Sequence, residues 1–281
     1  MGRRKLLFRT ESRRFSRSLL YMIESAIARI PHVSTMGSYQ EICDAMANAS
    51  IENQDSFIAW GKHGWTVNIL ADYSIYFDVP ESQEEADKIS LKYCTNALMD
   101  KYFERLLGEK LCKKAVLKEA IFCFQSRKYR ACACLLFALM DGEMIKSQSI
   151  DNNRKFGERG IKFLKSMVNQ RKDVKNATLL FLEFQCLSSA LASVFASDPN
   201  FLNEPGLINR NYVMHGMITR RVLRKDCVQL FLIYGNLLRY IDFYSKIKDI
   251  PEDTSPTVIE VMKQRMLENA PVKNPLTKDD N

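Results

Sequence analysis

The chain is short of the residues that make turns, with 11 glycines and 8 prolines among its 281 residues. Sandwiches and barrels of many short strands need such residues at frequent intervals, so their scarcity favours a helical protein. Apolar residues make up 46% of the chain and charged residues 26%, a composition typical of globular proteins with a sizeable buried core.

Long apolar runs are absent as well. No stretch approaches the ~20 apolar residues that cross a bilayer, and the first residues lack the apolar core and cleavage site of a secretory signal. The Arg-rich, acid-poor start leaves room for a mitochondrial transit peptide, but Glu11 and the length of the amphipathic pattern count against one. We therefore expect a cytoplasmic protein without a membrane as partner.

The eight cysteines lack the spacing of a metal site. None forms a C-x-x-C pair, and several lie in apolar runs. A disulfide framework is not expected in a chain of this length without a secretion signal, so we expect reduced cysteines in the core. Carboxylate clusters are not evident either, and we expect no metal ion and no other cofactor.

Positive charge is plentiful and unevenly placed. The formal net charge is +8, and residues 1–30 alone carry eight basic and two acidic side chains, a local net of +6. Such an excess suits a polyanionic partner, either a nucleic acid or an acidic membrane surface. The apolar spacing predicts an amphipathic helix over about 15–30 with Arg13, Arg14 and Arg17 on its other face. That face is either the solvated side of a docked helix, which we favour, or a surface for RNA or a membrane.

Helical periodicity dominates the chain from residue 83 onward. The expected helices span 40–48, 83–107, 112–125, 128–147, 174–195 and 221–247, with a weaker one ending near 171. Short turns between helices of similar length predict an all-α antiparallel bundle over 83–248. We expect a mainly helical basic extension over 1–82, in which 56–80 has room for a short hairpin or an irregular segment. A polar tail with a short helix is expected over 249–281.

One stretch, GLINRNYVMHGMITRR at 206–221, combines residues suited to phosphodiester chemistry. On a helix Asn211 and His215 share a face because they are four residues apart, and Arg210 is next to them. A helix beginning after the cap residue Asn209 would offer its positive end to a phosphate. Arginine binds phosphate oxygens, and histidine exchanges protons near neutral pH.

The segment RNYVMH at 210–215, followed by glycine, resembles the R-x4-6-H motif of the HEPN superfamily (higher eukaryote and prokaryote nucleotide-binding domains). The segment EAIFCFQSRKYRACACLLFALMDGEM at 119–144 is similar to that superfamily's preceding helix pair. The matching features there are Ala120, Phe124, Tyr129, Ala131 or Ala133, and Asp141 or Glu143. The resemblance covers about 84–247, and it leaves the N-terminal third uncovered.

The resemblance implies a helical bundle that dimerises so that two motifs face each other in a composite active site. It implies a metal-independent endoribonuclease, leaving a 2′,3′-cyclic phosphate, of the kind found in toxin–antitoxin or phage-defence systems. The partners would be RNA, a second copy, and an inhibitory antitoxin or regulator. His215 would transfer protons, Arg210 would bind and polarise the scissile phosphate, and Asn211 would orient the site.

Several assignments near the motif have alternatives. Four basic residues that follow it are expected to contact RNA backbone, or else to form a solvated helix face: Arg220, Arg221, Arg224 and Lys225. Tyr212 is expected to pack rather than to stack on a base, and Asp141 or Glu143 to pair with an arginine. Arg210 and His215 could also serve only as polar contacts at a helix interface. The whole chain could then be a non-catalytic helical module that binds RNA, a nucleotide or a protein partner.

Overall fold

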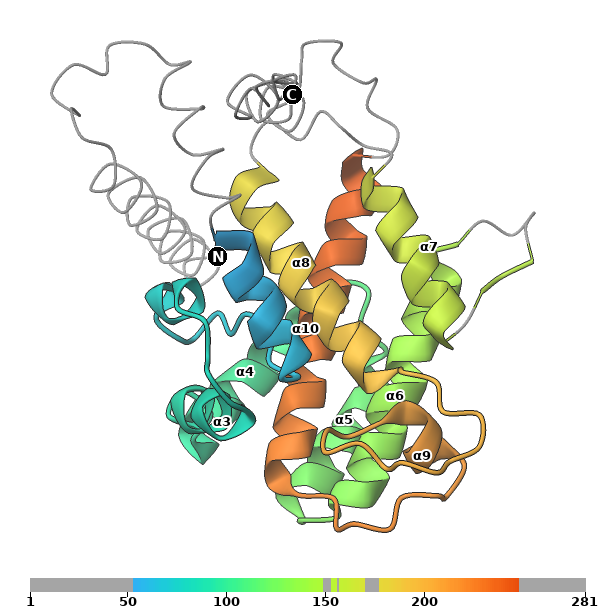
Figure 1. The fold of residues 1–281 in the computed structure, drawn as a ribbon. Coiled ribbons are helices and arrows are strands. Elements are labelled where there is room, and N and C mark those ends of the chain that lie inside the picture. The colour runs from blue at the N-terminus through green and yellow to red at the C-terminus, as the bar shows by residue number, and fades with distance from the viewer. Residues whose placement is uncertain (1–52, 149–152, 156, 170–176, 248–281) are drawn as a thin grey trace, which may run out of the picture.

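The computed structural model describes residues 53–148, 153–155, 157–169 and 177–247. Within these ranges every regular element is helical and none is a strand, which confirms the all-α prediction (Figure 1). The helices expected over 15–30 and 40–48, the basic N-terminus and the tail over 249–281 lie outside the described residues.

Residues 53–62 are helical and are followed by an irregular stretch and the 3-10 helix η2 (Tyr73–Phe77). The later elements are α3 (Gln83–Leu91), α4 (Asn96–Gly108), α5 (Lys114–Gln125), α6 (Tyr129–Lys146), α7 (Gly157–Asn169), α8 (Ala177–Val194), α9 (Arg210–Met214) and α10 (Arg224–Ile247). A short turn joins α5 to α6, and Lys113 lies against Gly142, so the two helices form an antiparallel hairpin.

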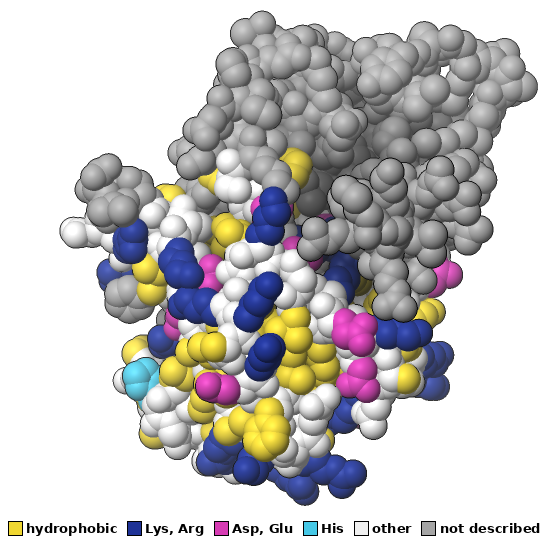
Figure 2. Space-filling view, turned by 180° about the vertical axis from the view of Figure 1, so that it is seen from behind, with side chains coloured by type: hydrophobic (Ala, Val, Ile, Leu, Met, Phe, Trp, Pro, Cys, Tyr) yellow, Lys and Arg dark blue, Asp and Glu magenta, His cyan; other side chains and the backbone are white. Residues whose placement is uncertain are grey.

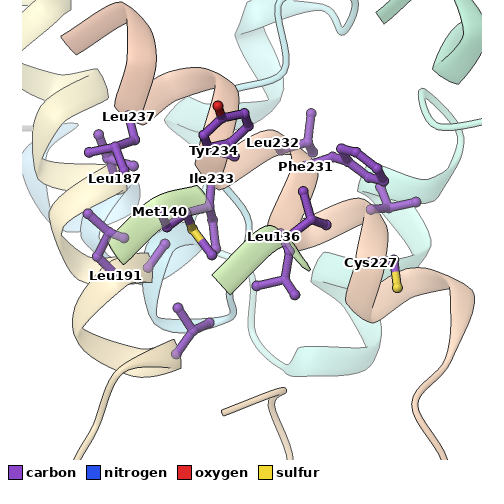
Figure 3. Packing of buried hydrophobic residues seen from close by; sticks show 14 of the residues in the cluster. Leu136, Met140, Leu187, Leu191, Cys227, Phe231, Leu232, Ile233, Tyr234 and Leu237 are labelled. Carbon is purple, nitrogen blue, oxygen red and sulfur yellow. The ribbon is translucent and has the colours of Figure 1, made fainter. Parts of the chain in front are cut away.

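Helix α10 is the centre of the core. Figure 3 shows its side chains between those of α6, such as Leu136 and Met140, and those of α8, such as Leu187 and Leu191. On the side of α4 and α5, the Phe231 ring lies 4.7 Å from that of Phe103. All of these residues belong to one hydrophobic cluster, which buries α10 on several sides.

The region 53–78 joins the same cluster through both tryptophans. The side-chain amide of Asn236 in α10 donates to the Val67 carbonyl at 2.8 Å and to the Thr66 hydroxyl at 3.1 Å. These bonds satisfy an extended stretch of backbone that has no strand beside it, as buried polar groups require. The predicted boundary at residue 82 stays a prediction.

Two sequence expectations about elements need correction. For 56–80 a short hairpin or an irregular segment was expected: an irregular stretch is present, but no hairpin forms, and a helix over 53–62 overlaps the start of this region. The alternation through Trp65 and Val67 suggested a strand, but Thr66 and Asn68 between them are buried too. Burial of all four side chains of 65–68 in tertiary contacts, rather than a strand with one buried face, therefore explains this stretch.

The helix expected over 83–107 is two helices. Asn68 donates to the Tyr93 carbonyl at 3.3 Å and to Cys94 Sγ at 3.6 Å, which holds the chain in a turn between α3 and α4. Thr95 then caps α4 by accepting from the Leu98 amide. At the start of α3, Ser82 caps the helix by accepting from the Glu85 amide at 3.2 Å.

Candidate functional site

The motif segment forms a single helical turn on the surface beside α6. Helix α9 has five residues and ends at Met214. Gly216, two residues further on, has a φ of 72°, in the left-handed region that glycine tolerates. The helix expected to begin after Asn209 is this single turn, and the separate helix expected over 221–247 is α10, which begins at Arg224. A turn this short has only a weak dipole, and phosphate binding at its start stays a prediction.

Asn209 is the cap that the sequence predicted. Its side-chain oxygen accepts from the amides of Asn211 at 2.9 Å and Tyr212 at 3.4 Å, and its amide group donates to the Ala196 carbonyl at 3.0 Å. The same residue thus starts the turn and ties it to the end of α8. Because the Asn211 and Tyr212 amides already have an acceptor, they are not free to bind an anion.

Arg210 is held by a carboxylate of α6. Its Nε and Nη2 atoms donate to Asp141 Oδ2 at 3.1 and 2.9 Å, and its Nη1 donates to Asn211 Oδ1 at 3.2 Å. This confirms that Asp141 pairs with an arginine of the bundle, whereas Glu143 pairs with Lys146. The Arg210 side chain remains 22% exposed, so the guanidinium keeps N–H groups that face solvent.

His215 is exposed at the end of the turn, and its ring lies 5.7 Å from that of Phe201. Its backbone amide donates to the Asn211 carbonyl at 3.0 Å, but its ring makes no hydrogen bond to Arg210 or Asn211 within the described residues. One chain therefore brings Arg210 and Asn211 together and leaves the imidazole open to the surroundings. Tyr212 is buried, as expected for a packing residue.

The basic residues after the motif are engaged within the chain. Arg220 forms a two-pronged ion pair with Asp226, whose side chain is 1% exposed, and Lys225 pairs with Asp87. Arg224 donates to the Cys94 carbonyl at 2.7 Å and lies over the Phe124 ring. Arg221 is exposed, and its side chain has no such partner in the part of the chain that the structure describes. Contact of these four residues with RNA stays a prediction.

Two carboxylates that the sequence analysis missed fix the loops around the motif. Asp198 accepts from the Tyr212 hydroxyl at 2.6 Å, and Glu204 accepts from the amides of Thr219 at 2.9 Å and Arg220 at 3.3 Å. We call this pair of carboxylates the loop clamp. The sequence ASDPN at 196–200 held a signal for Asp198, because an Asp before proline commonly bonds to backbone amides in a turn.

Acidification should release the loop clamp. The hydrogen bond that Asp198 accepts from the Tyr212 hydroxyl lowers the pKa of Asp198. The hydrogen bonds that Glu204 accepts from Thr219 lower the pKa of Glu204. A carboxyl group with a lowered folded-state pKa stabilises the fold above its ordinary pKa, and this contribution is lost as the pH falls through the lowered value. We expect amide protection over 209–220 to fall between about pH 5 and pH 2. Hydrogen exchange, corrected for its intrinsic pH dependence, measures this.

The matched control for the loop clamp is Tyr212→Phe, which removes the donor to Asp198 and keeps the buried ring. In this variant the loop should be less protected already at neutral pH and should change less on acidification. Protection that stays constant through the acid range in the parent chain would show that these carboxylates do not hold the loop.

The surface around the motif is open. Leu202, Met214 and Met217 are large apolar side chains that remain exposed beside it. Two hollows lie elsewhere, one lined by Tyr102 and Arg239 between α4 and α10, the other by Trp60 and Tyr93. No residue of 210–215 lines either of them.

The described residues contain no group of three or more His, Cys, Asp or Glu side chains arranged to hold a metal ion, and no helix of the length and apolarity that a bilayer span needs. Their seven cysteines are free thiols. Comparison of the chain with protein-family models, curated proteins and solved structures found no match.

Proposed function

We propose that the chain is a metal-independent endoribonuclease of the HEPN type whose active site forms between two copies. The observation that supports this best is the pairing of a partly exposed Arg210, oriented by Asp141 and Asn211, with an exposed histidine one helical turn away. Arginine suits a scissile phosphate and histidine suits proton transfer. The toxin–antitoxin or phage-defence setting, with an inhibitory partner, belongs to the same proposal.

The exposed histidine and the exposed apolar side chains beside it are the reason for proposing a second copy. The His215 imidazole has no hydrogen-bond partner among the described residues, so a further group is needed to bind and orient the substrate, and water must be excluded from the reacting atoms. Leu202, Met214 and Met217 surround the motif with exposed apolar surface. A two-fold contact through this surface would place a second Arg210 and His215 opposite the first pair.

In the proposed reaction the ribose 2′-oxygen attacks the phosphorus and the bond to the 5′-oxygen breaks. His215 of one copy accepts the proton of the 2′-hydroxyl and, as the imidazolium, returns a proton to the leaving 5′-oxygen, while the phosphate lies against Arg210 of the other copy. Arg210 stabilises the charge on the phosphate oxygens while Asp141 and Asn211 hold its guanidinium in place. The products are a 2′,3′-cyclic phosphate and a 5′-hydroxyl.

The purified full chain should cut single-stranded RNA in the presence of EDTA. The new 5′ ends should accept phosphate from polynucleotide kinase directly, and the new 3′ ends should resist ligation until the cyclic phosphate is opened. The absence of cleavage across a diverse RNA pool, at concentrations where the chain is dimeric, would contradict the proposal.

The alternative, a non-catalytic module that binds RNA, a nucleotide or a protein, is favoured by one contact. Asp141 neutralises Arg210 within the chain, which weakens the attraction of that guanidinium for a phosphate. If Arg210 has only a structural role, the chain should not cleave RNA. Loss of His215 should then leave the binding of RNA, nucleotide or protein unchanged.

A further inference from the structure

We propose that the outer side of α5 and the α5–α6 turn bind single-stranded nucleic acid. The site, which we call the α5 face, consists of Lys114, Lys118, Phe122, Arg127 and Lys128. It lies outside the motif and the four basic residues that follow it. The proposal does not rest on cleavage at His215.

The helical spacing places the α5 face in solvent. Lys114, Lys118 and Phe122 follow one another at intervals of four residues, so they form one stripe along the helix. All three are exposed, whereas Leu117 and Ala120 on the opposite side are buried. The stripe therefore has no packing role in the bundle.

The charge on this surface is mostly positive. Residues 113–130 contain six basic side chains and a single acidic one, Glu119. The side chains of Lys114, Lys118 and Arg127 have no ion pair with any described residue. They differ in this from Arg220 and Lys225, which already have carboxylate partners. Cations without a partner are the ones that can neutralise phosphates without first breaking a contact.

Phe122 is the aromatic member of the site. Its side chain is 61% exposed, and the Lys128 ammonium lies 5.9 Å from the ring centroid. An exposed ring beside cations is the arrangement on which bases of a single strand stack while the phosphates meet basic side chains. In Figure 2 basic side chains gather beside hydrophobic ones at the lower end of the molecule, where the α5–α6 turn lies in Figure 1.

Arg127 occupies a backbone position that glycine normally fills. Its φ is 59°, its amide donates to the Phe124 carbonyl at 3.0 Å, and the Lys128 amide donates to the Cys123 carbonyl at 2.8 Å. This is the bonding pattern of a helix C-terminus whose left-handed residue is usually glycine, and any other side chain there costs about 1 kcal/mol. An arginine at such a position, with no ion pair to any residue that the structure describes, points to a ligand for its charge.

The α5 face is connected to the loop that follows the motif. Arg130, at the start of α6, donates to the Ile218 carbonyl at 3.5 Å. A nucleic-acid strand that is bound on the α5 face and extends past Arg130 would therefore run beside residues 216–218. Single-stranded nucleic acid fits better than an anionic membrane because the stripe contains only one large apolar side chain, too little to enter a bilayer surface.

Binding is best measured with full-length chain carrying His215→Ala, so that the probe stays intact. Anisotropy of a labelled 12-nucleotide oligouridine should report binding that weakens with salt. Phe122→Ala should weaken it about tenfold. The double variant Lys118→Gln, Lys128→Gln should lower the slope of log affinity against log salt by about 1.4. Matched controls are Val79→Ala, an exposed apolar side chain elsewhere, and the double variant Lys62→Gln, Lys88→Gln.

Arg127→Gly provides a variant that keeps the fold, because glycine suits the left-handed backbone. It should weaken binding severalfold while the urea midpoint stays the same or rises. Parent-like binding by Phe122→Ala and the Lys118/Lys128 variant would overturn the α5 face, as would equal capture by phosphatidylserine vesicles through the same residues. If the oligonucleotide binds but wild-type chain cuts no RNA, only the proposed nuclease fails. If cleavage occurs without any of these losses, only the α5 face fails.

Discussion

Replacement of His215 by alanine should lower the rate of RNA cleavage about 10²–10⁴-fold, the range that removal of a general acid or base produces. The loss should fall on kcat rather than on KM, because the imidazole acts on the protons of the transition state and not on the bound strand. Cleavage of a fluorogenic oligoribonucleotide in EDTA measures both constants. His63→Ala is the matched control, since His63 lies far along the chain and contacts Gln83 instead.

Mixing two inactive variants tests the composite site directly. Arg210→Ala supplies an intact histidine and His215→Ala an intact arginine, so a mixed dimer would contain one complete pair. Random exchange of subunits should then restore roughly a quarter of the wild-type activity. A mixture that stays inactive would place both residues of each site in one chain, and full activity of His215→Ala alone would remove the nuclease proposal.

Gly61→Ala should destabilise the fold by about 2–3 kcal/mol. Gly61 lies where residues 53–62 cross α8, and an added Cβ would clash with the Cys186 carbonyl oxygen and lie 2.6 Å from Ser189 Cβ and 2.9 Å from the Ala190 nitrogen. Two of these neighbours are backbone atoms of a buried helix, which cannot move aside as a flexible side chain would. The Ser189 hydroxyl also donates to the Ile58 carbonyl at 2.9 Å, which fixes the same crossing.

Urea unfolding at constant slope measures this loss. The matched control is Gly108→Ala at the end of α4, where an added Cβ meets nothing within 4 Å. We expect that substitution to change stability by no more than about 0.5 kcal/mol. Equal stability of the two variants would mean that residues 53–62 do not pack against α8 as the structure has them.

The helical class followed from the sequence because periodicity and the shortage of turn residues agree. The approximate positions of α5, α6 and α8 also followed, since each is a long, mainly apolar segment flanked by polar or turn residues. The errors lie where tertiary contacts override local pattern. Asn68, distant in sequence from α4, holds the turn that divides 83–107, and no local signal reveals such a contact.

At the candidate site, the sequence predicted the cap Asn209 and a carboxylate partner for arginine. It did not predict that α9 would stop after one turn, because Gly216 within a helical pattern is compatible with either outcome. The ion pairs of Arg220 and Lys225 could not be predicted either. Asp87 of α3 reaches Lys225 only in the folded chain, and Asp226 reaches Arg220 only because the loop before α10 turns back toward it. A charge in a sequence does not reveal whether the fold has already neutralised it.

The loop clamp has a consequence for how this protein can change over generations. The motif is held by hydrogen bonds of the loops around it and by the ion pair of Arg210 with Asp141, whereas most apolar burial lies in the helices around α10. A lineage could therefore exchange His215 or lengthen the flanking loops with little cost to the bundle. Related proteins with and without catalytic activity would then share one scaffold, and their thermal stability would not distinguish them.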